Sequence, residues 1–310
     1  MPKICYVERN FADRSLQRIQ QANTILDEYD GQGFVLTLRQ LYYQFVARGL
    51  VSNTQKEYKN LGSLVNDARL AGLIDWTHLE DCTRNLKSNS HWQHPASIVE
   101  SSARQFMYDK WANQKSRIEV WIEKEALAGI FDGICTELDI PYFCCRGYSS
   151  QSEMWSASQR LLRYKAAKQR VVILHFGDHD PSGIDMTRDI ENRLKTFTRG
   201  QFRLMRLALN MNQVEEYNPP PNPAKETDSR HAGYVVEYGD ESWELDALEP
   251  TVLVELVSDA VARLRDDGQW KEDLEREMEA RLALKGISGG WNQVLRFLYT
   301  NGLMPKDDEA

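Results

Sequence analysis

The strongest constraint on the fold is an alternation of apolar runs and amphipathic stretches in the middle of the chain. Four apolar runs have the length of a strand, and three helical patterns separate them: runs at 117–122, 141–146, 171–176 and 203–209, helices at 125–137, 152–168 and 183–197. Strands that alternate with helices form βαβ units, whose sheet is mostly parallel. The sequence therefore predicts an α/β domain that starts near residue 116.

Three further helical patterns precede this domain, at residues 11–29, 38–49 and 55–72. Thr37 is a suitable N-cap for the second helix, and Asn53 or Thr54 for the third. The segment 73–85 is expected to be a short β-wing or a loop. Three helices followed by a hairpin-like segment outline a winged helix-turn-helix domain of the CAP type.

A polar stretch without periodicity at residues 87–102 marks the boundary between the two parts. Helical patterns return at 250–284 and 288–300, after the last strand. The expected organisation is a winged-helix domain, a linker and a metal-binding domain with C-terminal helices, at residues 1–95, 96–115 and 116–310.

The composition is that of a soluble globular protein, with 42% hydrophobic and 27% charged residues. The apolar runs are far shorter than the ~18 residues of a membrane span, and the N-terminus lacks the apolar core of a signal peptide. Five cysteines without a C-x-x-C pair favour a reducing compartment. We therefore expect a cytoplasmic, nucleoid-associated protein with no membrane partner.

The net charge of −8 is unevenly distributed along the chain. Residues 1–117 contain 15 Lys and Arg against 12 Asp and Glu, and the remaining residues contain 23 against 34. A basic front half and an acidic back half fit a DNA-facing module joined to a metal-binding module. The same split also fits a chance distribution of charge.

The paired aspartates Asp178 and Asp180 follow the apolar run VVILHF directly, and a helix begins after Gly183. Ligands of open parallel sheets bind beyond the carboxyl ends of the strands. Two carboxylates at such an end are best explained by a hard cation such as Mg²⁺. Glu123 follows the strand at 117–122 in the same way, so it is the expected third ligand.

Three other interpretations of the D-x-D pair were weighed. Turn and capping chemistry is common where a strand meets a helix. The spacing also fits an EF-hand loop, but such a loop follows a helix, and Asp185 stands where an apolar residue is usual. We therefore reject the EF-hand. A phosphatase-type aspartate nucleophile stays open, although it leaves Glu123 unexplained.

Four polar residues near these motifs are expected to have no chemical role. His175 is expected to pack within its strand. For His179, between the aspartates, contact with a phosphate is the alternative to the favoured interpretation of a bystander. For Glu244 and Asp246, in WELDALEP, two interpretations are open: carboxylates that support the metal ligands, or the lip of the last helix, which we favour.

In this order and spacing, the motifs VWIEKEAL, CCRGYSSQS and D-x-D-P-x-G resemble those of the Toprim domain. That family uses the acidic constellation to hold Mg²⁺ for strand cleavage, strand joining or primer synthesis. The resemblance implies that Glu123, Asp178 and Asp180 bind Mg²⁺, for which Mn²⁺ can substitute. It also implies structural turns at Gly147 and Gly183.

The segment TLRQLYYQF at 37–45 resembles the catalytic segment of the topoisomerase VI A subunit and of its meiotic double-strand-break relative. In that family an Arg-x-x-x-Tyr pattern in a winged-helix domain precedes a Toprim domain. The resemblance covers roughly residues 30 to 250. It implies that Tyr43 is the nucleophile, with Arg39 on the same helix face, and that the product is a 5′-phosphotyrosyl link. Core packing is the alternative for this tyrosine and for Tyr42.

The chemistry of these side chains agrees with that role. A tyrosine has a pKa near 10, so it attacks phosphorus only when it is helped to lose its proton. The guanidinium of Arg39 would favour the phenolate and can hold a phosphate by two hydrogen bonds. Mg²⁺ held by Glu123 and the two aspartates would stabilise the charge on the phosphate and the leaving oxygen, which makes Glu123 an expected catalytic residue.

DNA contacts are expected from the polar side of the third helix, opposite its leucines, and from Arg146, which stands where the family has a lysine before the turn glycine. The residues on that polar side are Lys56, Lys59, Asn60, Ser63 and Asn66. A solvated helix face explains the same pattern nearly as well.

The functional prediction is a compact, stand-alone A-subunit homologue that cleaves double-stranded DNA. The family implies a homodimer in which the tyrosine of one subunit works with the metal site of the other. No Walker-type loop is present, so no ATP site is expected, and strand passage would need a separate ATPase subunit. The alternatives are a Toprim nuclease that uses a metal-activated water, and an inactive DNA-binding or partner-recruiting protein.

Overall fold

The computed structural model describes residues 3–79 and 91–304. These residues form two compact units. The first combines residues 3–79 with Ser116–Leu264, and the second combines residues 91–115 with 265–304. The C-terminal helices beyond Leu264 therefore group with residues 91–115, and not with the sheet as the predicted 116–310 domain implies.

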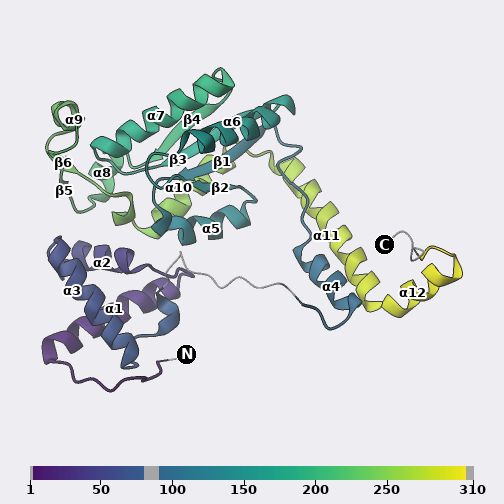
Figure 1. The fold of residues 1–310 in the computed structure, drawn as a ribbon, viewed down its shortest axis with the longest axis horizontal. Coiled ribbons are helices and arrows are strands. Elements are labelled where there is room, and N and C mark those ends of the chain that lie inside the picture. The colour runs from purple at the N-terminus through teal and green to yellow at the C-terminus, as the bar shows by residue number, and fades with distance from the viewer. Residues whose placement is uncertain (1–2, 80–90, 305–310) are drawn as a thin grey trace. The chain divides into compact units, whose positions relative to one another are not determined.

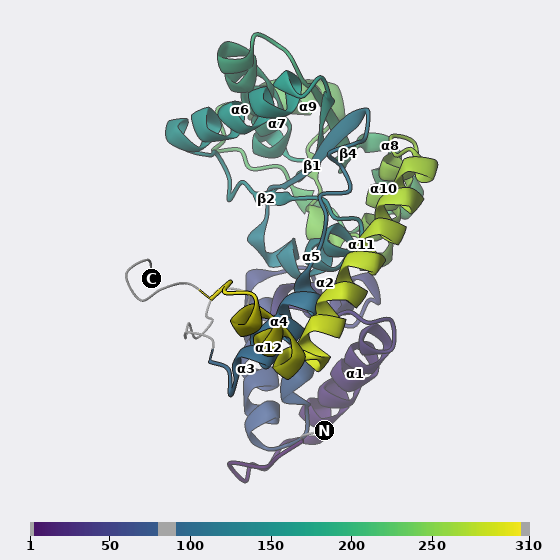
Figure 2. The ribbon, with the colours of Figure 1, turned by 90° about the vertical axis from the view of Figure 1, so that its right-hand side faces the viewer.

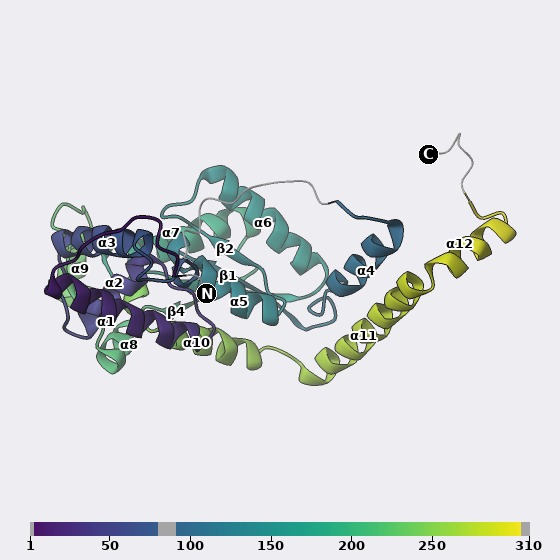
Figure 3. The same ribbon diagram turned by 90° about the horizontal axis from the view of Figure 1, so that it is seen from below.

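In the second unit, helix α4 (Pro95–Gln105) packs along helix α11 (Asp267–Gly289), and α12 (Trp291–Thr300) follows (Figure 3). The segment 96–115, expected to be a linker, thus contains most of a helix. Its N-terminus has a proline in the first turn and a capping box from His94, signals that the polar composition of the stretch obscured. Trp111 buries its ring against Trp270 and contributes a core to this unit.

The first unit is built on a parallel sheet of four strands in the order β2-β1-β3-β4. The strands are β1 (Ser116–Ile122), β2 (Tyr142–Cys144), β3 (Arg170–Phe176) and β4 (Arg203–Ala208). The central strands β1 and β3 are almost wholly buried, as expected when helices cover both faces of a parallel sheet. The prediction of an α/β fold with a mostly parallel sheet is confirmed.

Helices lie on both faces of this sheet (Figures 1 and 2). They are α6 (Gln151–Ala166) and α7 (Pro181–Thr198) on one face, and α5 (Ala128–Glu137) and α10 (Pro250–Ala262) on the other. On the first face, Trp121 of β1 packs among apolar side chains that include Leu161 of α6. On the second face, Phe131 of α5 stands edge-on to Phe176 of β3.

The N-terminal residues of the first unit form three helices, α1 (Asp13–Asp30), α2 (Leu38–Ala47) and α3 (Gln55–Leu70), with their own apolar core. Thr37 caps α2 and Thr54 caps α3, both among the caps predicted from the sequence. Of the expected wing at 73–85, residues 76–78 form the single turn η1 (Trp76–His78), and residues 80–85 lie outside the described part of the chain.

The chain between β4 and α10 carries small elements that line one end of the sheet. They are α8 (Met211–Tyr217), α9 (His231–Tyr238), the antiparallel pair β5 (Asn222–Pro223) and β6 (Glu241–Ser242), and the turn η3 (Leu245–Ala247). None of the helices in the described ranges has both the length and the apolar character that a bilayer crossing requires.

Gly183 lies in the first turn of α7, where the chain approaches the end of β3 very closely. A Cβ atom at this position would stand 2.3 Å from the carbonyl oxygen of Asp178. We expect Gly183→Ala to lower the free energy of unfolding by about 1–3 kcal/mol, because the backbone must shift to relieve the clash. Urea denaturation monitored by circular dichroism would measure the change.

Gly133→Ala is the matched control, since Gly133 also lies in a helix, α5, but a Cβ there would meet no atom within 4 Å. This substitution should raise the free energy of unfolding by about 0.5–1 kcal/mol, because alanine favours the helix. Equal effects of the two substitutions would contradict the close approach at Gly183.

Candidate active site

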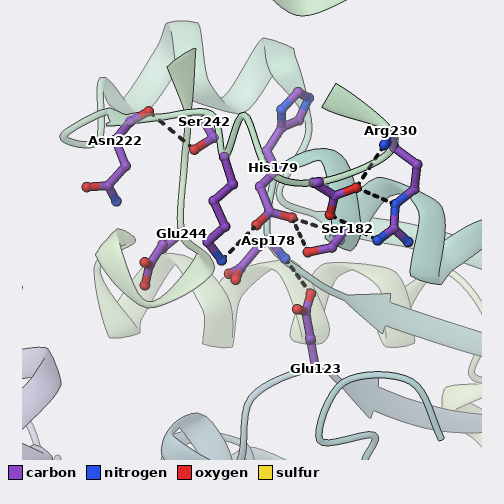
Figure 4. A network of polar contacts seen from close by, with 12 residues as sticks. Glu123, Asp178, His179, Ser182, Asn222, Arg230, Ser242 and Glu244 are labelled. Atoms are coloured by element: carbon purple, nitrogen blue, oxygen red, sulfur yellow. Dashed lines mark hydrogen bonds and ion pairs between the residues drawn. The ribbon is translucent and has the colours of Figure 1, made fainter. Parts of the chain in front are cut away.

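The register of the sheet brings Glu123 and Asp178 together at the carboxyl ends of β1 and β3. Ile122 pairs with Phe176 in the parallel ladder, so Glu123 and Gly177 follow at the same level. One carboxylate oxygen of Glu123 accepts a hydrogen bond of 2.9 Å from the backbone N–H of Asp178 (Figure 4). A Cβ at Gly177 would lie 2.9 Å from that oxygen, so the glycine makes room for the carboxylate.

Asp178 is buried, and its Oδ1 atom has two partners. It accepts a hydrogen bond of 2.7 Å from the backbone N–H of Leu245 and lies 2.9 Å from Nζ of Lys124. Burial raises the pKa of Asp178 to about 6, although the charge of Lys124 opposes this shift. Burial and the negative charge of Asp178 raise the pKa of Glu123 to about 7.

Asp180 caps helix α7. Its Oδ1 atom accepts hydrogen bonds from the backbone N–H of Gly183 at 2.6 Å and from the hydroxyl of Ser182 at 2.9 Å. The capping interpretation of the D-x-D motif therefore holds for one oxygen of Asp180. The helix begins at Pro181, two residues before the predicted start, because Asp180 closes its first turn. The other oxygen lies 3.9 Å from Nζ of Lys225.

Arg206 of β4 supports the loop that carries both aspartates. Its guanidinium donates hydrogen bonds to the carbonyl oxygens of Gly177, Asp178 and Gly183 at 2.5–3.2 Å. A buried arginine that binds several carbonyls fixes the path of the backbone between β3 and α7. No pattern in the sequence marks Arg206 for this role, because only the fold brings β4 beside this loop.

Lys124, Glu244 and Asp246 form an ion-pair network beside Asp178. Nζ of Lys124 lies 2.9 Å from Glu244 and 3.0 Å from Asp246. Burial alone would lower the pKa of Lys124, but the surrounding carboxylates outweigh it and raise that pKa above its ordinary value. Glu244 and Asp246 therefore belong to the site, and the expectation that they merely form the lip of the last helix is wrong.

Helix α2 adds Arg39 and Tyr43 to this network. The guanidinium of Arg39 forms ion pairs with Glu244 and, at 2.7 Å, with Asp246. Burial alone would raise the pKa of Glu244, but the charges of Lys124 and Arg39 outweigh it and lower that pKa to about 2. The carboxylates of Glu244 and Asp246 thus connect the helix that carries Tyr43 to the end of the sheet.

Tyr43 is 5% exposed, and it lies close to the carboxylates of Glu244 and Asp246. Burial raises the pKa of Tyr43 above its ordinary value, and the charges of Asp246 and Glu244 raise it further. Arg39 opposes this shift but does not compensate for it. Arg39 therefore favours the phenolate, as expected, but burial and the two carboxylates outweigh its effect on the pKa of Tyr43. Tyr42 turns its hydroxyl to the backbone of residues 52–54, consistent with a packing role.

A pocket of about 760 Å³ opens between α2, α3 and the carboxyl end of the sheet. Its lining includes Arg39, Tyr43, Lys124, Asp178, Asp180 and Glu244. Lys59 of α3 and Lys225 also line it, so four cationic side chains face the two aspartates across one space. Glu123 is not among the lining residues. Such a pocket suits an anionic ligand together with a cation.

The carboxylates at this pocket suit Mg²⁺ only with further ligands. Within residues 3–79 and 91–304, no three His, Cys, Asp or Glu side chains are arranged to hold a metal ion as they stand. Mg²⁺ is often bound through only one or two carboxylates, with waters and substrate phosphates as its other ligands. Asp178 and Asp180 fit that pattern. Glu123 lies next to this pair.

The expected DNA-contact residues lie on exposed surfaces of the first unit. On α3, they are Lys56, Lys59, Asn60, Ser63 and Asn66. The side chain of Arg146 is 68% exposed and pairs with Glu125. The following residue, Gly147, has φ +82°, a conformation that favours glycine.

The two histidines near the aspartates do not face the pocket. His175 is buried in β3, where its ring contacts the hydroxyl of Thr187. His179 points away from Asp178 (Figure 4) and bonds the hydroxyl of Tyr234 at 2.8 Å.

No protein-family model, curated protein or solved structure matches this chain. The functional inference therefore rests on the residues of the site. Two features of the sequence could have signalled the network that the sequence analysis missed. Lys124 follows Glu123 directly, and Glu244 and Asp246 have the same spacing as the D-x-D pair.

The raised pKa of Glu123 predicts a specific dependence of stability on pH in the absence of divalent cations. The folded state binds the proton of Glu123 more tightly than the unfolded state does. The stabilisation that this proton provides is therefore complete below the pKa of Glu123 in the unfolded state, and it is lost as the pH rises through about 7. Between pH 5 and pH 8, we expect the wild type to lose on the order of 1–3 kcal/mol of unfolding free energy relative to Glu123→Gln.

Urea titrations in EDTA at several pH values would measure this difference. Glutamine retains an oxygen that can accept the N–H of Asp178 but cannot ionise, so it is a close control. Parallel stability curves for the two proteins would rule out a strongly raised pKa at Glu123.

Proposed function

We propose that this protein is a Mg²⁺-dependent enzyme that cleaves double-stranded DNA through Tyr43, in the manner of the topoisomerase VI A subunit. In this proposal the three N-terminal helices act as a winged helix-turn-helix domain and the sheet acts as a Toprim domain. The observation that carries the proposal is the single pocket lined by Tyr43, Arg39, Asp178 and Asp180. These residues come from two distant parts of the chain and lie in the segments that resemble the motifs of that family.

In the proposed reaction, the hydroxyl oxygen of Tyr43 forms a bond to a backbone phosphorus of DNA. The bond from phosphorus to the 3′ oxygen breaks, and the leaving oxygen takes up a proton. The products are a 5′-phosphotyrosyl link and a free 3′ hydroxyl, so the bond energy is kept for resealing. When bound, Mg²⁺ would stabilise negative charge on the phosphate and the leaving oxygen.

The neighbouring side chains would bind the phosphate and prepare the tyrosine. The side chain of Arg39 is 43% exposed, so it can turn its guanidinium to a phosphate, which accepts two parallel hydrogen bonds. Glu244 lies close to Tyr43 and would orient its hydroxyl by accepting a hydrogen bond from it. Asp178 and Asp180 would bind the cation, with Glu123 adding negative charge beside them.

DNA would lie along α3 and over the pocket. Lys59 would contact the duplex where it lines the pocket. Outside the pocket, the duplex would contact four other residues of α3: Lys56, Asn60, Ser63 and Asn66. Arg146 would contact the backbone on the sheet side. We also propose that Mn²⁺ can substitute for Mg²⁺ and that this chain has no ATP site. The protein would be a homodimer that associates with the nucleoid in the cytoplasm. Strand passage would require a separate ATPase subunit.

One observation favours a second candidate function. Tyr43 is almost fully buried and has a raised pKa, which suits a structural tyrosine better than a nucleophile. The protein would then be a Toprim nuclease that hydrolyses DNA with a metal-activated water. A third candidate, an inactive DNA-binding or partner-recruiting protein, draws support from the capping role of Asp180.

Incubation with plasmid DNA and Mg²⁺, followed by detergent denaturation, would distinguish these candidates. We expect broken DNA with protein covalently attached to its 5′ ends. Tyr43→Phe should abolish cleavage because it removes the attacking oxygen, and Asp178→Asn should reduce cleavage by at least about 100-fold, by analogy with the loss of other transition-state charge stabilisers. Tyr42→Phe is the matched control and should cleave normally.

Free ends that persist in Tyr43→Phe would instead establish the nuclease. DNA binding without breaks in either Mg²⁺ or Mn²⁺ would establish the inactive protein.

The homodimer proposal can be tested by mixing two inactive variants. If the tyrosine of one subunit serves the acidic site of the other, a mixed dimer of Tyr43→Phe and Asp178→Asn contains one complete site and one doubly defective site. We expect such dimers, formed by co-expression, to nick DNA instead of breaking both strands. Continued inactivity of the mixture would show that the pocket of a single chain is the complete site.

A further inference from the structure

Lys124 follows Glu123 directly and extends its ammonium group between three carboxylates. Nζ lies 2.9 Å from Asp178 Oδ1, 2.9 Å from Glu244 Oε2 and 3.0 Å from Asp246 Oδ1. Of the three N–H donors of the ammonium, two are donated to Glu244 and Asp246, and Asp178 is an ion-pair partner. The Lys124 side chain is 17% exposed and that of Asp246 is 0% exposed, so this cation is held largely away from water.

Asp178 belongs both to this arrangement and to the D-x-D pair. Its Oδ1 atom faces Lys124, and the residue also lines the pocket with Asp180. In two-metal sites, two cations about 3.5–4 Å apart act together on one phosphate. The ammonium of Lys124 already places one positive charge against Asp178, 2.9 Å from its Oδ1 atom.

We propose that the ammonium of Lys124 takes the place of a second metal ion, so that each chain binds one divalent cation and not two. This inference rests on the proposed function for the first ion, at Asp178 and Asp180. Its own support is the set of three short contacts, in which a fixed positive charge already neutralises the carboxylates that would bind a second ion.

The charges around Lys124 are close to balance. Asp178, Glu244 and Asp246 contribute three negative charges, and Lys124 and Arg39 contribute two positive charges within ion-pair distance of them. A divalent ion added to this group would have to displace the ammonium. Removal of Lys124 leaves Asp178 without its ion-pair partner and leaves Glu244 and Asp246 with Arg39 alone, which creates a demand for positive charge.

Lys124→Ala should therefore open a second cation site. The oxygens now lie 2.9–3.0 Å from Nζ, whereas a bound Mg²⁺ has oxygen ligands at about 2.0–2.1 Å. The carboxylates must then move inward by about 1 Å, which the space left by the lysine side chain allows. This requirement agrees with the finding that no three acidic side chains in the described ranges hold a metal as they stand.

The test counts bound metal ions in the full-length protein without DNA. Mn²⁺ is titrated in, and the free ion is measured by electron paramagnetic resonance. We expect one ion per chain for the wild type and two for Lys124→Ala. Lys225→Ala is the matched control, because it removes an equal charge 3.9 Å from Asp180 but outside the group of three carboxylates. It should bind one ion.

Two ions in the wild type, or no additional ion in Lys124→Ala, would overturn the inference. No ion in the wild type and one in Lys124→Ala would support the inference about Lys124 while removing the metal site of the proposed function. If Lys124→Ala is unfolded in EDTA by circular dichroism, Mn²⁺ should restore its fold, and a variant that stays unfolded in excess Mn²⁺ counts against the inference.

Discussion

The site depends on the balance of charge at the carboxyl end of the sheet, where Lys124 neutralises a buried aspartate. Asp178 is 7% exposed, and a carboxylate at such a position costs several kcal/mol when it lacks a cation or hydrogen-bond donors. Lys124 supplies the charge, and the N–H of Leu245 supplies a hydrogen bond. The two aspartates of the D-x-D motif differ for this reason: Asp178 is held by a cation, whereas Asp180 is held by the start of a helix.

The segment 243–249 joins the two parts of the first unit around this charge. Trp243 pairs with His179 through two backbone hydrogen bonds, and Leu245 binds Asp178. Further along the segment, Glu249 accepts a hydrogen bond of 3.1 Å from Gln44 of α2. One short segment therefore contacts both the aspartate loop and the helix that carries Tyr43. In the proposed function, a movement of this segment would change the tyrosine and the acidic pair together.

Much of the fold could be predicted because it follows from local periodicity. The strands β1 and β3 are uninterrupted apolar runs, and the caps of α2 and α3 are the threonines that the sequence indicates. The proximity of Glu123 and Asp178 also follows from pattern, since both residues end strands of one parallel sheet. Helix α4 was missed because its polar composition hides a weak apolar face, and its partner α11 lies about 160 residues later in the sequence.

The sequence alone determined the parallel α/β fold and the acidic residues at the strand ends, because hydrophobic periodicity and strand termini are local properties. Only the tertiary structure decided which charges meet there. The sequence does not indicate that the side chains of Lys124, Arg39 and Glu244 meet. They meet because the segment after β6 lies against the carboxyl end of the sheet. Their ion pairs depend on distances of about 3 Å between distant residues, and no local pattern specifies such a contact. The protonation of Tyr43 also depends on the tertiary structure, because its pKa follows from burial and from two carboxylates about 200 residues away in the sequence.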